Sequence, residues 1–313
     1  MAIYVISKEQ IVTALRTCRR IISKERAALK FKEKLKSNKF LMTAELFPPK
    51  GVDISSFLRR ADCLLDVDAV NVTDNQRASM RAGSLVMSKI LLEHRIEPIL
   101  QIAARDKNRI ALQSELLSAN ILDIENVLLL SGDHPNTGEY AGIKTVYDLD
   151  TMQLIKTARL LETGVDLAGK KLQGSPKFCI GAVANPSAQP NDLQALMFEK
   201  KVRAGAEFFQ TQAIFDVCAY KDFFDKIKHL KVKVLPGIIL IKSPKFMQFM
   251  QSLPGMNIPQ KIQDRINSAS DSLAEGIKIC SEIVKELRSF ADGVHIMAIG
   301  IEEYIPEIIK MSL

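Results

Sequence analysis

Eight short aliphatic runs alternate with segments of helical periodicity along this chain, and no other feature constrains the fold as strongly. The runs expected to be strands are 41–46, 69–73, 98–103, 126–131, 178–184, 207–213, 232–238 and 293–299. The segments with helical periodicity are 54–66, 84–95, 108–122, 150–163, 192–204, 218–230, 245–252 with 259–268, 271–290 and 301–311. Near-continuous apolar strands are typical of a parallel sheet covered on both faces. Eight such units predict an α/β fold, a closed (β/α)8 TIM barrel spanning 40–313.

An open doubly wound sheet is the main alternative to the barrel. Such sheets bind dinucleotides at a G-x-G-x-x-G turn after the first strand, and no such turn follows residues 41–46. The length of 313 residues, 47% of them hydrophobic, suits one large α/β domain with a sizeable core. We therefore predict the closed barrel.

The N-terminal segment 1–39 differs from the rest of the chain in charge. It holds eleven Lys and Arg residues against three Glu, a net charge of +8, whereas the remainder carries 32 basic and 33 acidic residues. Ser7 as N-cap, followed by apolar residues from Ile11 to Ile22 at helical spacing, predicts a basic amphipathic helix over 7–37. We expect this helical extension to cover the bottom of the barrel. The alternatives are a docking arm for an acidic partner subunit and a membrane-surface contact.

The composition of the body excludes several classes of protein. Its near-neutral charge argues against a nucleic-acid-binding domain. No run approaches the roughly 18 apolar residues of a membrane span, and the N-terminus lacks the apolar core of a secretory signal. Five widely spread cysteines without a C-x-x-C pair, and four histidines without ligand spacing, predict neither a disulfide framework nor a metal site. We expect a soluble, cytoplasmic protein that binds neither nucleic acid nor membrane.

The carboxylates of Glu45 and Asp133 are the strongest candidates for chemistry. In a (β/α)8 barrel the reactive side chains lie at the C-terminal ends of the strands, and Glu45 stands there, with Pro48 and Pro49 ending the first strand. Asp133 follows Gly132, which permits close approach of a ligand to the backbone. Two carboxylates in a dry pocket repel, so one is expected to stay protonated as a general acid while the other stabilises charge. The alternative for Glu45 is a place on a solvated edge strand.

Polar side chains also end the other predicted strands, and a closed barrel brings them to one rim. They are Asn71, Thr73, Asp74, Gln101, Ser131, Asn185 and Gln212. Gln212 offers both a donor and an acceptor to the amide edge of a heterocycle. Lys200, Lys201 and Arg203 are placed either to meet a phosphate or to lie on a solvated helix face. The long connection 134–149 is placed to fold over a ligand. Together these residues predict an enzyme acting on a planar, polar heterocycle with a phosphate-bearing cofactor; without a barrel they are scattered loop residues.

Six segments in barrel order together resemble the methylenetetrahydrofolate reductase family, whose members are flavin-dependent (β/α)8 barrels. They are 43–50, 70–73, 105–115, 126–133, 204–212 and 236–238, within a likeness that spans about 40–300. Segments 105–109 and 140–148 are most similar to the branch found in fusions with homocysteine methyltransferases and in acetogen-type complexes. The likeness is to the short form without the C-terminal regulatory domain.

The resemblance implies a reaction and a role for several residues. It implies hydride transfer from N5 of reduced flavin to 5,10-methylenetetrahydrofolate, giving 5-methyltetrahydrofolate for one-carbon metabolism, in methionine biosynthesis or the acetyl-CoA pathway. Glu45 matches the general acid that protonates N10, and Asp133 the carboxylate that stabilises the resulting cation. Gln212 matches the pterin-binding glutamine, and Phe249 lies near the place of an aromatic residue that stacks on folate and nicotinamide. The residues at flavin-binding positions are Thr73, Gln101, Ser131, Gly132, Asp133, Asn185, Lys200 and Lys201.

Three departures from the well-studied bacterial members bear on the cofactor. Gln101, Ser131 and Gln189 stand where those enzymes have His, Arg and His that engage the flavin. FAD is the expected cofactor, with FMN as the alternative. If neither NADH nor NADPH is the donor, we expect an electron-supplying or zinc-containing partner subunit near 1–39, in an oligomeric assembly. Two other interpretations stay open: a flavin-free barrel that transfers the methyl group of methyltetrahydrofolate, and a non-catalytic subunit of a one-carbon complex.

Overall fold

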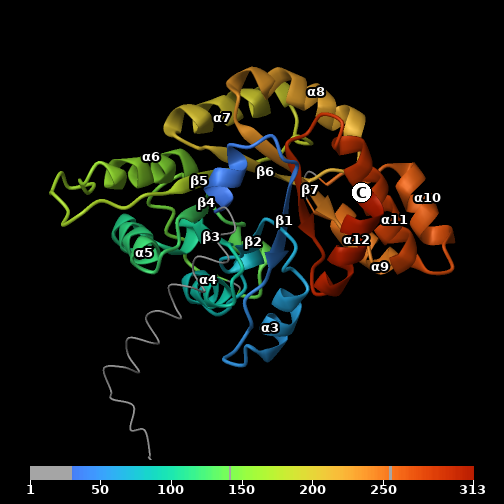
Figure 1. Ribbon diagram of the computed structural model, residues 1–313, viewed down its shortest axis with the longest axis horizontal. Helices are drawn as coiled ribbons and strands as arrows, with labels where there is room; N and C mark the ends of the chain where they lie inside the picture. Colours follow the sequence, from blue (N-terminus) through green and yellow to red (C-terminus); the bar gives the residue numbers. More distant parts are fainter. Residues whose placement is uncertain (1–29, 141, 254–255) are drawn as a thin grey trace, which may run out of the picture.

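The computed structural model, which describes residues 30–140, 142–253 and 256–313, is a closed barrel of eight parallel strands (Figure 1). The strands are β1 (Leu41–Leu46), β2 (Ala69–Val72), β3 (Pro98–Ala103), β4 (Asn126–Leu130), β5 (Cys179–Ala184), β6 (Phe208–Ala213), β7 (Lys233–Ile239) and β8 (Gly293–Met297). Each strand pairs with the next along the chain, and β8 closes the barrel on β1, with Thr43 opposite His295. The predicted (β/α)8 TIM barrel is confirmed.

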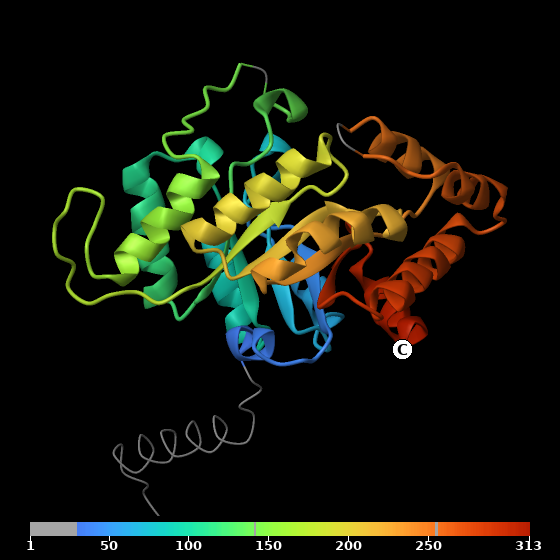
Figure 2. The same cartoon turned by 90° about the horizontal axis from the view of Figure 1, so that it is seen from above.

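Helices cover the outside of the barrel in both views (Figures 1 and 2). They are α3 (Ser55–Asp62), α4 (Ser84–Glu93), α5 (Arg109–Ile121), α6 (Thr151–Glu162), α7 (Asn191–Ala204), α8 (Val217–Ile227), α9 (Pro244–Gln251), α10 (Gln260–Ser268), α11 (Ser272–Leu287) and α12 (Ile305–Ser312). Polar N-caps start several of them, because a side-chain oxygen can satisfy the free N–H groups of the first turn. Asn108 caps α5, Asp150 caps α6 and Asp271 caps α11.

Three strands end earlier than their aliphatic runs predict. β2, β4 and β8 stop at Val72, Leu130 and Met297, whereas the runs continue to 73, 131 and 299. After β4 the chain turns at Gly132 with φ +88°, and after β8 it turns at Ile299 with φ +45°. A left-handed backbone ends an extended ladder, and a β-branched residue rarely adopts it. The turn at Ile299 was therefore not predictable from the residue type at this position.

The helix α2 (Phe31–Leu35) closes the N-terminal end of the barrel (Figure 2). The ring of Phe31 is fully buried and meets Phe208 edge-on, with 5.3 Å between the ring centroids. Leu35 packs into the same apolar cluster, which lies inside the barrel at the starts of the strands. The helix α2 therefore lies at the barrel bottom, the place where a covering N-terminal extension was expected. The remainder of the predicted helix, from Ser7 to residue 29, lies outside the described residues.

A second and larger apolar cluster fills the space between the strands and the surrounding helices. Every residue of β1, β2 and β3 is buried, because the helices cover the outer face of the barrel and the interior of the barrel covers the inner face. Among the described residues, no helix is both long and apolar enough to cross a membrane.

Candidate functional site

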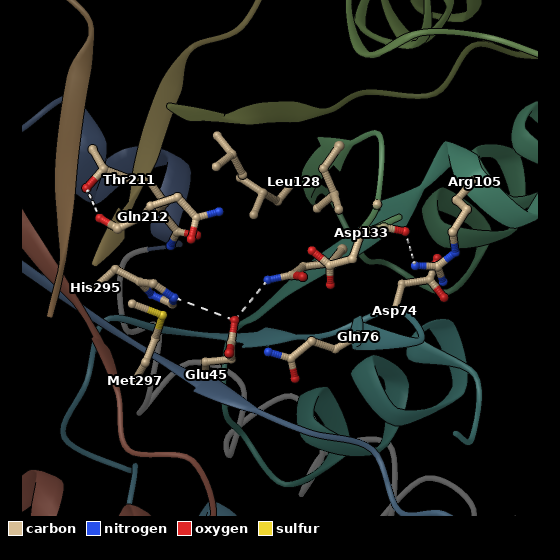
Figure 3. A pocket seen from close by; sticks show the side chains of 15 residues that line it. Glu45, Asp74, Gln76, Arg105, Leu128, Asp133, Thr211, Gln212, His295 and Met297 are labelled. Carbon is tan, nitrogen blue, oxygen red and sulfur yellow. Dashed lines mark hydrogen bonds and ion pairs between the residues drawn. The ribbon is translucent and has the colours of Figure 1, made fainter. Parts of the chain in front are cut away.

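Three adjoining cavities open at the C-terminal mouth of the barrel, and Asp133 and Gln212 line all three. Glu45 lines the first two, and Figure 3 shows the first of them. The three side chains that the sequence predicted to act together therefore share one mouth. The other predicted rim residues that line these cavities are Asp74, Gln101, Ser131, Gly132, Asn185 and Lys201.

Glu45 is buried at the end of β1, with 8% of its surface exposed. Its Oε2 accepts a hydrogen bond from Nε2 of Gln101 at 3.3 Å and lies 3.8 Å from Nε2 of His295. Its Oε1 is buried and has no hydrogen-bond partner among the described residues. The alternative of a solvated edge strand is wrong, because β1 is paired on both sides. The structure instead presents one unsatisfied carboxyl oxygen at a cavity.

Asp133 differs from Glu45 in exposure. Its side chain is exposed to solvent, and Oδ2 accepts the backbone N–H of Arg77 at 2.7 Å. The two carboxylates were expected to share one dry pocket. In the structure Glu45 is buried and Asp133 is exposed. Gly132 also differs from expectation, because a Cβ there would meet Cβ of Arg105 at 3.1 Å. The glycine allows the turn and the close packing of Arg105, not only the approach of a ligand.

Arg105 is a buried cation that holds the loops of the mouth together. Its side chain is 1% exposed and forms two hydrogen bonds with the carboxylate of Asp106, at 2.8 and 2.6 Å. The same guanidinium donates to the backbone carbonyls of Asn75 at 3.0 Å and Asp133 at 3.1 Å. Arg105 therefore joins the ends of β2, β3 and β4. The signal available in the sequence was a charged residue directly after an apolar strand.

Asp74 also lines the first cavity, but its charge is compensated. Its Oδ2 accepts the N–H of Ala103 at 2.9 Å and the ammonium of Lys107 at 2.5 Å. Lys107 also pairs with Glu115 at 2.7 Å. Burial raises the pKa of the Glu115 carboxyl, while burial lowers the pKa of Lys107 less than Asp74 and Glu115 raise it. Of the two buried acids that line the first cavity, Asp74 is paired with Lys107, whereas Glu45 has no Lys or Arg partner within the described part of the chain.

The third cavity contains the predicted cofactor residues. Lys201 is partly buried there, and its ammonium donates to the carbonyl of Val183 at 2.6 Å. Burial lowers the pKa of Lys201. Its neighbour Lys200 is exposed on α7, so the solvated-face interpretation applies to Lys200. Thr73 is buried after β2, and its hydroxyl has no partner among the described residues.

The second cavity, of about 380 Å³, is lined mainly by apolar side chains, within the size range of ligand pockets. Phe249 of α9 lies at this cavity with 37% of its surface exposed. The guanidinium carbon of Arg77 is 4.7 Å from the centre of the Phe249 ring. Glu139, from the long loop after β4, lines the same cavity. This loop therefore reaches the mouth, as its position in the sequence suggested.

A polar network inside the barrel is the part of the site that the sequence analysis missed. It joins Asn71, Gln210, Thr43 and His295, all of them buried, and ends at Glu45. Asn71 was expected on the rim but lies within β2 and points to this network. Each member is a polar residue within an apolar strand, which was the available signal.

The comparisons with known proteins agree on one family. A family profile described as Methylenetetrahydrofolate reductase matches residues 30–313. Methylenetetrahydrofolate reductase 2 of Schizosaccharomyces pombe is 23% identical, over 90% of this chain and 46% of its own length. A probable methylenetetrahydrofolate reductase (NADPH) of Caenorhabditis elegans is also 23% identical, over 85% and 41%. The chain thus spans about half the length of these curated relatives.

Solved structures show the same barrel. An uncharacterized protein from Clostridium thermocellum, whose structure holds two copies of 5-methyl-5,6,7,8-tetrahydrofolic acid, is 17% identical with a TM-score of 0.66 and covers 91% of this chain and 98% of that one. An oxaloacetate acetylhydrolase is 8% identical with a TM-score of 0.51, covering 90% and 84%. At these identities the likeness is one of fold.

Proposed function

Because this chain belongs to the methylenetetrahydrofolate reductase family, we propose that it is a flavin-dependent enzyme that reduces 5,10-methylenetetrahydrofolate to 5-methyltetrahydrofolate. The observation that best supports this proposal is the carboxyl group of Glu45. One of its oxygens is held by Gln101, and the other is buried without a partner among the described residues. Buried polar atoms are normally hydrogen-bonded, so an unpaired one beside a cavity is ready to meet a ligand.

A folate suits the chemistry of the two cavities that Glu45 lines. The first is bordered by Asp133 and Gln212, which can bind the amide and amine edge of a pterin. The second is lined mainly by apolar side chains and suits the aminobenzoate ring, with Phe249 at its wall. The Clostridium thermocellum protein, which shares the fold, binds a folate of the same class.

Glu45 and Asp133 divide the chemistry of such a substrate between them. Glu45 would give its proton to N10, so that the bond from N10 to the bridging carbon breaks and a cation forms. Asp133, turned to the cavity mouth and oriented by the N–H of Arg77, would stabilise that cation. The buried acid, Glu45, would therefore act first, and the exposed carboxylate of Asp133 would then stabilise the cation.

The third cavity fits the anionic part of a flavin. Lys201 is partly buried, and among the described residues it forms no ion pair with a carboxylate. A phosphate oxygen would compensate this charge, and Ser131 and Asn185 line the same space. When bound, the flavin would supply the hydride. FAD is the first candidate, and FMN the second.

The colour of the purified protein tests this proposal. We expect a yellow protein that absorbs at about 450 nm, or a colourless one that becomes yellow with FAD or FMN. The reduced protein is then mixed anaerobically with methylenetetrahydrofolate, and reoxidation of the flavin is followed with the formation of methyltetrahydrofolate. A protein that binds neither flavin but does bind methyltetrahydrofolate would instead support the methyltransferase alternative. A protein that binds flavin without folate turnover would support the non-catalytic subunit.

We further propose that residues 1–29 dock an electron-supplying or zinc-containing partner, in an oligomeric and cytoplasmic assembly. The basic charge of 1–39 supports this, because it contrasts with a near-neutral body. Since Phe31 and Leu35 of α2 pack into the apolar cluster at the barrel bottom, the deletion should end at residue 29 and spare Phe31. The full chain and this deletion are compared for co-purification of a partner from the native cell. Equal recovery of the partner by both would count against the docking role.

A further inference from the structure

The side chain of His295 lies inside the barrel between a scaffold of amides and the carboxyl of Glu45. It is 3% exposed and comes from β8, directly opposite Thr43 of β1. Its Nδ1 is 3.0 Å from Oγ1 of Thr43. Its Nε2 is 3.8 Å from Oε2 of Glu45 (Figure 3). The two ring nitrogens therefore face different partners. The position of the ring proton decides whether Nε2 presents an N–H donor or a lone pair to Glu45.

The amides behind Thr43 determine the direction of its hydroxyl group. Asn71 donates from Nδ2 to Oε1 of Gln210 at 2.6 Å, and Gln210 donates from Nε2 to Oδ1 of Asn71 at 3.0 Å. With the two amides in this orientation, each side chain both donates to and accepts from the other. The second Nε2 hydrogen of Gln210 is then directed to Oγ1 of Thr43, at 3.1 Å. Thr43 accepts this bond, so its own hydrogen is free for an acceptor.

Two acceptors lie near the hydroxyl of Thr43. Nδ1 of His295 is 3.0 Å away, whereas the carbonyl of Val294 is 3.4 Å away. The shorter contact has the ordinary length of a hydrogen bond, and the longer one exceeds it. Thr43 therefore donates to Nδ1, and the neutral imidazole carries its proton on Nε2, on the side of Glu45.

We propose that His295 is a positioning residue for Glu45, held by Thr43 in the Nε2–H tautomer and ready to donate to the carboxylate that Glu45 becomes. This inference rests on the proposed function. The proton leaves Oε1 of Glu45 for the substrate nitrogen, the O–H bond breaks and an N–H bond forms. The Nε2–H of His295 stabilises the new charge on Oε2. The present 3.8 Å separation shortens as that charge develops.

The surroundings of His295 leave Glu45 as its ionisable partner. On the neighbouring strand β7 it faces Gly237, which has no side chain. The other charged groups that line the same cavity are Asp74, Arg105 and Asp133. Asp74 is paired with Lys107, and Arg105 with Asp106. Asp133 is exposed and bonded by the N–H of Arg77.

The tautomer can be observed without substrate. The full-length protein is labelled with ¹⁵N-histidine, and the ring nitrogens are recorded by long-range proton–nitrogen correlation. The signals that vanish in His295→Asn belong to His295. We expect a protonated Nε2 and an unprotonated Nδ1 in the wild-type protein. Thr43→Ser should keep this single tautomer, whereas Thr43→Val should give a mixture of the two tautomers. A protonated Nδ1 in the wild-type protein overturns the proposal.

Two substitutions of His295 test its effect on the reaction. The amide nitrogen of Gln falls near the position of Nε2, whereas that of Asn falls near Nδ1. We therefore expect His295→Gln to reduce the folate within about threefold of the wild-type rate, and His295→Asn to be about 10- to 100-fold slower, the effect of losing a hydrogen bond to a charged group. In the pH profile of the folate reduction rate, the fall at high pH should move to higher pH in His295→Asn and should not move in His295→Gln. Flavin reduction by an artificial donor should not change in either variant.

The outcomes separate the inference from the proposed function. If the wild-type protein binds flavin but does not reduce folate, the proposed function falls, and the catalytic part of the inference with it. If the wild type reduces folate and the Gln and Asn variants are equally active or equally slow with unshifted pH profiles, the inference alone is wrong. The inference is supported if His295→Gln keeps the folate reduction rate, while His295→Asn loses it and shifts the alkaline limb of its pH profile.

Discussion

The backbone N–H of Arg77 donates a hydrogen bond of 2.7 Å to Oδ2 of Asp133, which ties the loop after β2 to the end of β4. That loop is unusual in its backbone, because Asn75, Arg77 and Ala78 all have left-handed φ values, of +44°, +54° and +50°. Such conformations persist only where the surroundings impose them, and they gather at functional sites. Asp133 therefore has a structural partner as well as a proposed electrostatic role.

Substitution of Asp133 can separate these two roles. Asp133→Asn keeps an acceptor for the N–H of Arg77 but removes the charge, whereas Asp133→Ala removes both. We expect Asn to slow the reoxidation of flavin by methylenetetrahydrofolate about 100-fold, measured by stopped flow. Hydrogen exchange at residues 75–79 should increase in Ala and not in Asn. Full folate turnover by the Asn variant would show that the charge is not needed.

Glu45→Gln is expected to abolish proton donation without loss of the cofactor. Gln keeps the size of the side chain and its bond to Gln101 but cannot act as an acid. We expect unchanged flavin binding and a folate reduction rate lower by about 100- to 10,000-fold. Glu303→Gln, at an exposed position, is the matched control and should behave as wild type. A Glu45→Gln protein that turns over folate normally would remove Glu45 from the mechanism.

The neighbouring lysines of α7 provide a paired test of the flavin site. Lys201 is shielded at the third cavity, and Lys200 is exposed. We expect Lys201→Met to weaken flavin binding at least tenfold, the effect of losing a charge-assisted hydrogen bond, and Lys200→Met to leave it unchanged. Titration of apoprotein with FAD and FMN, followed by flavin fluorescence, measures both. Equal affinity in the two variants would contradict the assignment of the third cavity.

Phe31 is expected to contribute to stability and not to activity. Its ring is fully buried at the end of the barrel opposite the mouth. Phe31→Ala should lower the free energy of unfolding by about 3 kcal/mol, because a large buried ring is removed. Urea unfolding measures this change, with exposed Lys36→Ala as control. Flavin absorbance should be unaffected. Loss of flavin before unfolding would show that the two ends are coupled.

Asp68 predicts a loss of stability in acid. Burial alone raises the pKa of Asp68, but hydrogen bonds from the N–H of Met42 and from Lys34 and Lys39 outweigh it and hold the pKa below its ordinary value. The unfolded chain therefore binds a proton more readily than the folded one. The contribution of Asp68 is complete above its unfolded pKa, about 3.9, and is lost as the pH falls through the folded value.

The matched variant is Asp68→Asn, with urea unfolding measured at several pH values. We expect Asn to be less stable than wild type at pH 7, and the difference to shrink as the pH falls below about 4. A difference that does not depend on pH would mean that the ionised form of Asp68 does not favour folding.

The eight strands and the rim could be predicted from the sequence because both depend on short-range patterns. Aliphatic runs between polar turns define parallel strands, and strand ends in such a barrel meet at one mouth. This reasoning brought Glu45, Asp133 and Gln212 together before any geometry was known. It could not distinguish Lys200 from Lys201, because one residue on a helix turns the side chain from solvent to cavity.

The internal network could not be predicted, because its members meet only through the closure of the barrel. Asn71 and Gln210 lie on β2 and β6, which are not neighbours in the barrel, and Thr43 and His295 meet only because β8 returns to β1. A bulge between Gln210 and Ala213 further shifts the register beside Gln212. Such contacts depend on register, which no local pattern reveals.

The position of α2 also has a consequence for the order of biosynthesis. Phe31 leaves the ribosome before β1, yet the ring that it meets edge-on, Phe208, lies on β6, and the cluster that it joins is completed by Leu235 of β7. The N-terminal end of the barrel therefore cannot be sealed until most of the chain has been translated. Up to that point the ring of Phe31 remains uncovered on the nascent chain, where a chaperone that binds aromatic residues can recognise it.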